Sequence, residues 1–264
     1  MQALPPINLK YPVLLHAGRS QGSGFFVTAT NGEMFLVTAK HVLHRPDRQL
    51  FSDVITVLCY VGEPGENNQC TLGLDLGTLS QVGCFRFAVN HDVVAIKVGE
   101  NIPGGDRGHF MKGISIMSGS PEAGIISVLP SAIKQYADVL VSNEVYIFGY
   151  PTSLGLGAAS GKEQFDPRAP LLRRGAVAGK YDPLKTIILD CPAYPGNSGG
   201  PIMEVEWCHD PEHGIYHRYS VIGVVSEFVP YMKSGAHENS GYSVGVPMDA
   251  VVAMMNGQTA QEAS

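Results

Sequence analysis

The sequence is poor in charge, and positive charge is scarcest. Asp, Glu, Lys and Arg make up 16% of its 264 residues, compared with about 25% in an ordinary soluble domain. The 18 basic residues are outnumbered by 24 acidic ones, which gives a net charge of −6, and no Lys/Arg stripe stands out. A protein that binds the nucleic-acid backbone is therefore disfavoured. Long surface helices rich in Glu and Lys are not expected.

Long apolar runs are also missing. No stretch approaches the ~18 residues that a membrane-spanning helix needs, so no membrane partner is expected. The N-terminus, Met1-Gln2-Ala3-Leu4-Pro5-Pro6, has no basic region followed by an apolar core, so a secretory signal is not predicted.

Cysteine is sparse and unpatterned. The odd number, the wide scatter and the absence of a CxxC pair favour free thiols over a disulfide framework or a zinc ribbon. Free thiols fit a reducing compartment, and we expect a cytoplasmic protein. The five residues are Cys59, Cys70, Cys84, Cys191 and Cys208.

The residues that are abundant are glycine and proline. There are 31 Gly and 18 Pro, well above ordinary usage. The hydrophobic fraction of 44% argues against an intrinsically disordered chain. Many short strands joined by tight turns fit this combination, which predicts an all-β fold.

Strand-like segments recur along both halves of the chain. Asn31-Gly32 separates two β-rich runs, Phe25–Ala29 and Met34–Ala39, and predicts a hairpin. Only Ser131–Leu140 and Pro247–Met255 look helical, and residues 152–171 read as a long loop. Gly104-Gly105 suggests a break between two halves, each expected to form a β-barrel. Further strands are predicted at Val54–Val61, Cys84–Val89, Val93–Val98, Val145–Phe148, Thr186–Leu189, Val221–Val225 and Tyr242–Val246.

The segment with the most chemical information is Tyr194-Pro195-Gly196-Asn197-Ser198-Gly199-Gly200-Pro201. Its G-x-S-x-G pattern also occurs in the nucleophile elbow of α/β-hydrolases, but that elbow leads into a helix. Here Gly199-Gly200-Pro201 and a strand-like run follow, so the elbow interpretation fails. The other interpretation is a glycine loop that exposes Ser198 beside two N–H donors able to stabilise an oxyanion.

A serine nucleophile needs a base, and the base needs an orienting acid. His41 is expected at the end of the second hairpin strand, where a rigid backbone would hold it. Asp92 precedes the apolar run Val93–Ile96, and an acid entering a buried strand needs a polar partner. An imidazole N–H is such a partner. His44 and Asp53 are the rival residues, but their local contexts fit less well.

The order His41, Asp92, Ser198 resembles the chymotrypsin-like serine peptidases with the trypsin fold. The matching blocks are Thr38-Ala39-Lys40-His41, Asp92-Val93-Val94-Ala95, Gly196–Pro201, Val221–Ser226 and Gly241–Pro247. They span about residues 22–255. Pro-Gly-Asn-Ser-Gly-Gly-Pro is most similar to the bacterial Deg-type, or high-temperature-requirement, peptidases.

The resemblance implies two packed six-stranded antiparallel β-barrels with a short C-terminal helix. The first barrel, residues 1–105, would carry His41 and Asp92, and the second, residues 106–264, would carry Ser198. The chain departs from secreted members in two places. Asn197 replaces the aspartate that pairs with a freed N-terminus, so activation by N-terminal cleavage is not implied. Val42 replaces the usual cysteine after the histidine.

Site residues beyond the triad follow from the same resemblance. The loop Gly196-Asn197-Ser198 would form the oxyanion hole, and the Ser226 hydroxyl would support Asp92. Nothing near Pro192 would pair with Lys or Arg, and Phe228 stands where a glycine usually keeps the pocket open. We therefore expect a preference for small or medium apolar side chains at the cleaved position. The pocket would be lined by Pro192, Ala193, Tyr194, Pro195, Ser226, Glu227 and Phe228.

The sequence thus predicts a serine endopeptidase that works through an acyl-enzyme on protein or peptide substrates, with no metal or cofactor. A non-catalytic peptide-binding module on the same scaffold, or an esterase, is the alternative. A homo-oligomer or a regulatory protein partner stays open. The run Cys208-His209-Asp210-Pro211-Glu212-His213, with His217, is irregular for zinc and predicts a solvent-facing hairpin loop.

Overall fold

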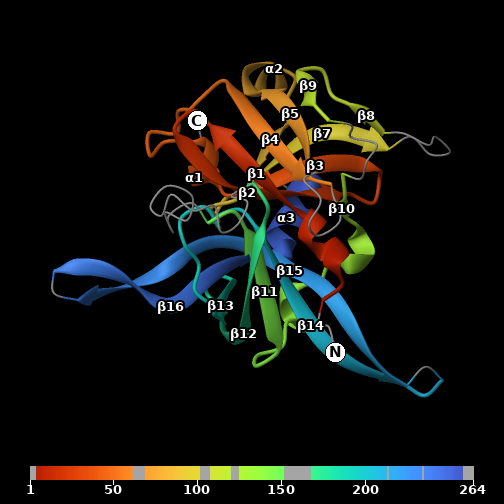
Figure 1. Cartoon of the computed structure of the whole chain (residues 1–264), viewed down its shortest axis with the longest axis vertical. Helices are drawn as coiled ribbons and strands as arrows, with labels where there is room; N and C mark the ends of the chain where they lie inside the picture. Colours follow the sequence, from red (N-terminus) through yellow and green to blue (C-terminus); the bar gives the residue numbers. More distant parts are fainter. Residues whose placement is uncertain are drawn as a thin grey trace.

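The computed structural model describes residues 4–61, 69–101, 108–119, 125–151, 168–212, 214–233 and 235–257. The expected loop at 152–171 and the expected break at Gly104-Gly105 therefore lie largely or wholly outside the described residues. In the described part of the chain, no helix is long and apolar enough to cross a bilayer. The fold is all-β, as the composition predicts, and is built from two sheets that pack against each other (Figure 1).

The first sheet has the order β6-β7-β3-β2-β1-β4-β5-β9, with β8 paired to β7 and β10 paired parallel to β2. Its strands are β1 (Pro12–Ala17), β2 (Ser20–Thr28), β3 (Glu33–Thr38), β4 (Val54–Tyr60), β5 (Gln69–Asp75), β6 (Phe85–Phe87), β7 (Val94–Asn101), β8 (Gly108–Phe110), β9 (Ile114–Ser118) and β10 (Ser127–Val128). The first sheet has ten strands where the resemblance implied six; three of the ten, β8, β9 and β10, are short segments beyond residue 105. The division into domains stays a prediction, and its boundary at 105/106 lies outside the described residues.

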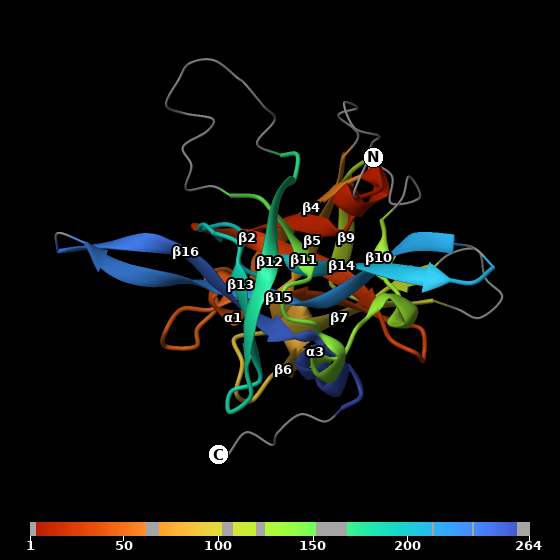
Figure 2. The same cartoon turned by 90° about the horizontal axis from the view of Figure 1, so that it is seen from below.

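The second sheet is a closed barrel of six strands, as predicted, in the order β11-β12-β13-β16-β15-β14. Its strands are β11 (Glu144–Gly149), β12 (Leu171–Tyr181), β13 (Thr186–Asp190), β14 (Pro201–Asp210), β15 (Gly214–Lys233) and β16 (Ala236–Pro247). The β14–β15 and β15–β16 pairs extend beyond the barrel as two long hairpins that point to opposite sides (Figure 2). The first of these hairpins ends near the predicted loop at residues 208–213, where Cys208 pairs with Tyr216 and Asp210 with Gly214; residue 213 lies outside the described residues.

Helical structure is short. It comprises α1 (Lys40–Leu43), α2 (Leu76–Gln81), α3 (Met248–Met255) and the 3-10 turns η1 (Pro6–Lys10), η3 (Pro130–Ala132) and η4 (Tyr136–Asp138). The predicted helix at 131–140 is wrong: Ile133 bridges to Val221 and the Lys134 N–H donates to the Val221 carbonyl. Pairing with the barrel takes hydrogen bonds that a helix would have used internally. The C-terminal helix is confirmed as α3.

Three apolar clusters hold the fold together. One fills the first sheet, around Leu15, Leu36 and Val57, and one fills the barrel, around Ile147 and Leu189. The third lies between the two sheets and joins Phe25 and Phe35 to Phe148, Val224 and Val251 of α3. Figure 1 shows α3 lying between the first sheet and the barrel. This shared core fixes the two sheets relative to each other, and therefore fixes the loops that meet along their junction.

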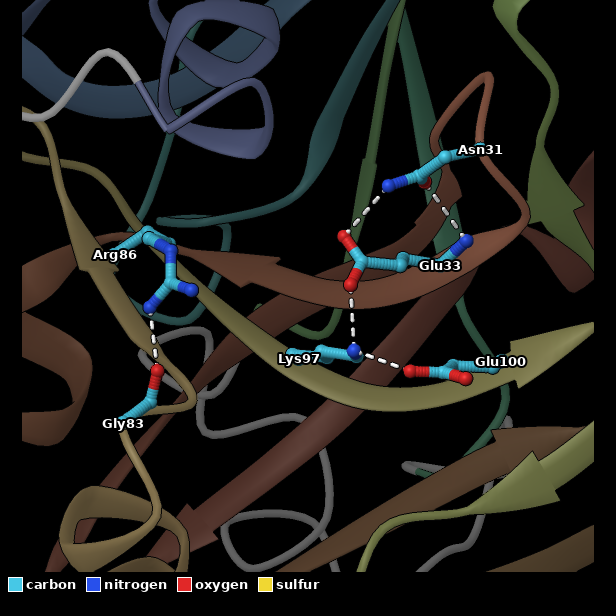
Figure 3. Close-up of polar contacts among 6 residues, drawn as sticks. All are labelled: Asn31, Glu33, Gly83, Arg86, Lys97 and Glu100. Carbon is cyan, nitrogen blue, oxygen red and sulfur yellow. Dashed lines mark hydrogen bonds and ion pairs between the residues drawn. The ribbon is translucent and has the colours of Figure 1, made fainter.

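A polar cluster marks the end of β3 that is remote from His41. The Lys97 ammonium on β7 pairs with the Glu33 carboxylate at 2.5 Å and with Glu100, and Asn31 donates to Glu33 at 3.0 Å (Figure 3). Partly exposed pairs of this kind contribute about 0–1 kcal/mol each. These pairs hold the Asn31-Gly32 turn in place. The predicted hairpin at this turn is confirmed, with Phe25–Thr28 paired to Met34–Val37.

Candidate active site

His41 lies in the one-turn helix α1, directly after β3, and not at the end of the strand itself as predicted. Ala39, buried and extended, is the N-cap, and Val42 and Leu43 anchor the turn in the first core. The side chain of His41 is 51% exposed. The turn therefore presents an accessible imidazole on a rigid base.

Asp92 holds this imidazole from the bend before β7. The His41 backbone N–H donates to Asp92 Oδ1 at 3.2 Å, and His41 Nδ1 bonds Asp92 Oδ2. The Lys40 N–H also donates to the Asp92 carbonyl, at 3.3 Å. Because an ionised carboxylate only accepts hydrogen bonds, Nδ1 carries the proton. His41 Nε2 is then an acceptor, which is the form a general base requires.

Burial sets the charge of the neighbouring groups. It lowers the pKa of His44 and of His91 below the ordinary value of 6.5, so both rings are neutral at pH 7. Burial also lowers the pKa of Lys40, whose ammonium donates to the Ala88 carbonyl. His44 packs its ring edge against Phe87. His44 and His91 are therefore not cations that would compete with His41 for the Asp92 carboxylate.

The two rivals from the sequence do not join this pair. His44 Nδ1 contacts the Lys40 carbonyl at 3.3 Å, within its own turn. Asp53 is exposed ahead of β4, and its carbonyl accepts the Leu76 N–H. The structure therefore pairs His41 with Asp92 and not with Asp53.

Ser198 lies in the loop between β13 and β14, where two glycines set the backbone. Gly196 has φ +98° and Gly199 has φ +85°, conformations that favour glycine. The Asn197 N–H donates to the Tyr194 carbonyl at 2.9 Å, which together with positive φ at Gly196 defines a type II turn. The buried Asn197 side chain accepts the Tyr194 N–H at 3.0 Å. Asn197 thus closes the turn from both sides.

The loop packs against the segment that carries His41. The Ser23 N–H donates to the Ser198 carbonyl at 2.9 Å, and the Gly199 N–H donates to the Val225 carbonyl at 2.7 Å. A Cβ on Gly199 would lie 2.9 Å from the Ala39 nitrogen. Ser198 is therefore held beside α1 by contacts with both sheets. In the part of the chain that the structure describes, no hydrogen bond joins Ser198 Oγ to His41; such bonds are often long before substrate binds.

The N–H groups around Ser198 are available. Within the described ranges, nothing accepts the N–H of Gly196 or of Ser198. A type II turn with two free donors beside a serine can hold a developing negative oxygen.

Replacing Gly199 by alanine is expected to destabilise the protein by about 2–5 kcal/mol. The new Cβ would lie 2.1 Å from the Ser23 carbonyl oxygen and 2.3 Å from Thr38 Oγ1, at a backbone φ of +85°. Urea unfolding would measure the loss. Gly179→Ala is the matched control, because nothing lies within 4 Å of its Cβ position and it should change the midpoint little. Equal midpoints for the two variants would show that the loop can move away from β2.

The predicted pocket residues lie in two segments. Pro192–Pro195 lead into the loop, with Ala193 buried and the Arg173 guanidinium 4.3 Å from the Tyr194 ring centre. On β15, Ser226 is buried, Glu227 is exposed and Phe228 packs against the barrel core. The Ser226 hydroxyl makes no hydrogen bond to Asp92 among the described residues, so the support expected from it is not observed.

Sequence reasoning missed the residues that hold the segment before the Ser198 loop in place. Asn239 on β16 donates to the Ala193 carbonyl at 2.5 Å, and the buried Ser243 hydroxyl donates to the Cys191 carbonyl at 2.7 Å. On the other side of the loop, the Ser23 hydroxyl donates to the Gly196 carbonyl, and the Thr38 hydroxyl donates to the Ser23 carbonyl. The sequence signal for such close packing is a small residue between two glycines, in Gly22-Ser23-Gly24.

Comparison with known proteins shows the family of the chain. The family model of the trypsin-like peptidase domain matches residues 22–208. The chain belongs to this family, which confirms the sequence resemblance.

Among solved structures, the chain is similar to the HtrA-type protease AlgW with a tripeptide, with a TM-score of 0.53 and 14% identity over 96% of this chain and 62% of that one. A serine-to-alanine variant of AlgW, also with a tripeptide, gives a TM-score of 0.53 and 13% identity over 97% and 63%. The chain thus spans less than two thirds of these proteins. A search of curated protein sequences found no significant match.

Proposed function

We propose that the protein is a serine endopeptidase in which Ser198 is the nucleophile, His41 the base and Asp92 the group that orients His41. The observation that carries this is the His41 Nδ1–Asp92 Oδ2 bond beside a loop whose glycines expose Ser198 and two free N–H groups. The family membership supports the same assignment.

The reaction follows from these positions. Ser198 Oγ attacks the substrate carbonyl while His41 Nε2 takes the hydroxyl proton. The N–H groups of Gly196 and Ser198 hold the resulting oxyanion, and His41 returns the proton to the leaving amine. Water, deprotonated by His41, then attacks the acyl-enzyme and releases the acid and Ser198.

The substrate is an extended peptide that adds a strand to β15 at Ser226–Phe228. Such β-augmentation leaves specificity to the side-chain pockets. The HtrA-type protease AlgW has been solved with a tripeptide. This supports a peptide ligand for the same fold. Phe228 packs on the barrel core beside Ser226, which favours a shallow apolar pocket and small or medium apolar residues at the cleaved position.

Replacing Phe228 by alanine should enlarge the pocket. We expect kcat/KM for peptides with Phe or Tyr at the cleaved position to rise at least about tenfold relative to peptides with Ala or Val, since one or two methylene groups in an apolar pocket discriminate by roughly 10–200-fold. A peptide panel measures this ratio. Ile215→Ala, at an exposed position of β15 far from Ser226–Phe228, is the control. Preference of the wild type for Arg or Lys would contradict the pocket assignment.

A further inference from the structure

Ser23 has an unusual set of contacts for a residue outside the proposed triad. It lies on β2 of the first sheet and is completely buried, yet it contacts the Ser198 loop of the closed barrel. Strand β3 pairs with β2 only from Gly24 onward, so the backbone of Ser23 on that side is free to bond elsewhere. Its N–H donates to the Ser198 carbonyl at 2.9 Å, and its carbonyl accepts the Thr38 hydroxyl at 2.7 Å.

The hydroxyl of Ser23 completes the set. It accepts the Tyr150 N–H at 3.0 Å and donates to the Gly196 carbonyl at 2.6 Å. The carbonyls of Gly196 and Ser198 are therefore both bonded to one residue. These are the two residues whose N–H groups would hold the oxyanion.

We propose that Ser23 is a positioning residue that presets the spacing of the two oxyanion donors from the opposite sheet. This inference rests on the proposed function. The Gly196–Asn197 peptide lies between the two N–H groups, and Ser23 Oγ fixes its carbonyl end while Ser23 N fixes the far side of Ser198. A donor displaced by about 1 Å can cost on the order of 10²-fold in rate. A buried hydroxyl with two hydrogen bonds is a stiff anchor, because removing it takes a partner from the buried Gly196 carbonyl.

The close packing around Ser23 limits which side chains could replace its hydroxyl. A Cβ on Gly149 would lie 2.7 Å from Ser23 Oγ, and a Cβ on Gly199 would lie 2.1 Å from the Ser23 carbonyl oxygen. Two glycines thus leave room for Ser23 to reach both carbonyls.

The test is Ser23→Ala in the full chain, compared with Thr28→Val. Thr28 is a buried residue of the same strand whose hydroxyl bonds Ser127 at 2.6 Å, far along β2 from the loop. Each variant loses one buried hydroxyl. With a peptide anilide carrying Val at the cleaved position, Ser23→Ala should lower kcat by about 10- to 100-fold and change KM less than about threefold. Thr28→Val should keep kcat within about twofold.

A peptide boronic acid with the same side chain adds a readout that a purely structural role would not move. Its tetrahedral adduct places an oxygen in the hole, so its affinity for Ser23→Ala should fall by the same factor as kcat. An unchanged kcat with reduced stability alone would overturn the inference.

Amide hydrogen exchange separates this inference from the proposed function. Exchange in residues 194–200 should be at least about tenfold faster in Ser23→Ala than in wild type or Thr28→Val. If wild type cleaves no peptide, the proposed function fails, and the exchange data still decide whether Ser23 positions the loop. Equal exchange in all three proteins would overturn it.

Discussion

Ser198→Ala is expected to lower peptide hydrolysis on the order of 10⁴- to 10⁶-fold and to abolish covalent labelling by a fluorophosphonate. Without Oγ, no acyl-enzyme forms, and the remaining oxyanion donors and binding cleft give only residual catalysis. The fold should be unaffected, because in the described part of the chain Ser198 Oγ makes no hydrogen bond that would be lost.

The matched control is Ser118→Ala, at an exposed position of β9. It removes a hydroxyl without touching the site and should keep wild-type rate and labelling. Urea midpoints for both variants should lie within about 0.5 kcal/mol of wild type. A folded wild type that takes up no fluorophosphonate would favour the peptide-binding module. Ester turnover without peptide turnover would favour the esterase.

Asp92→Asn is expected to lower kcat by about 10⁴-fold while leaving the backbone in place. In the wild type, the Asp92 carboxylate accepts from His41 Nδ1 and from the His41 backbone N–H, the latter at 3.2 Å. An amide in its place can donate to Nδ1 and stabilise the tautomer with its proton on Nε2. That tautomer cannot accept the Ser198 proton. Steady-state kinetics and the rate of fluorophosphonate labelling should fall together.

Asp53→Asn is the control for this variant. Asp53 is the acid that rivals Asp92 in the sequence; it is exposed, and among the described residues no hydrogen bond joins it to His41. It should keep kcat within about twofold. If Asp92→Asn retained a rate within about fivefold of wild type, Asp92 would not orient the base.

Local patterns were enough to predict the elements that are fixed by nearby residues. Asn31-Gly32 predicted its hairpin because a tight turn with positive φ needs these residue types, and the turn glycine has φ +85°. Gly196 and Gly199 were expected to shape the Ser198 loop, and both have positive φ. The closed six-stranded barrel followed from the resemblance.

Elements that depend on distant partners escaped prediction. The segment at 131–140 has helix-compatible residues, but its backbone bonds to Val221 on β15 instead. The edge strands β8, β9 and β10 are two to five residues long, too short to show a period-2 pattern. They are strands only because β7, β5 and β2 offer unpaired backbone.

The sequence by itself determined the family, the all-β class and the three residues proposed for the triad, because each lies in a short motif whose chemistry needs those residue types. The tertiary structure alone decided that His41 lies in the helical turn α1 and that the Ser198 loop lies against that turn. It also showed the Ser23 clamp on Gly196 and Ser198, which joins residues 173 positions apart. The physical reason is that hydrogen-bond partners are selected by the packing of the two sheets on their shared core, which no local pattern encodes.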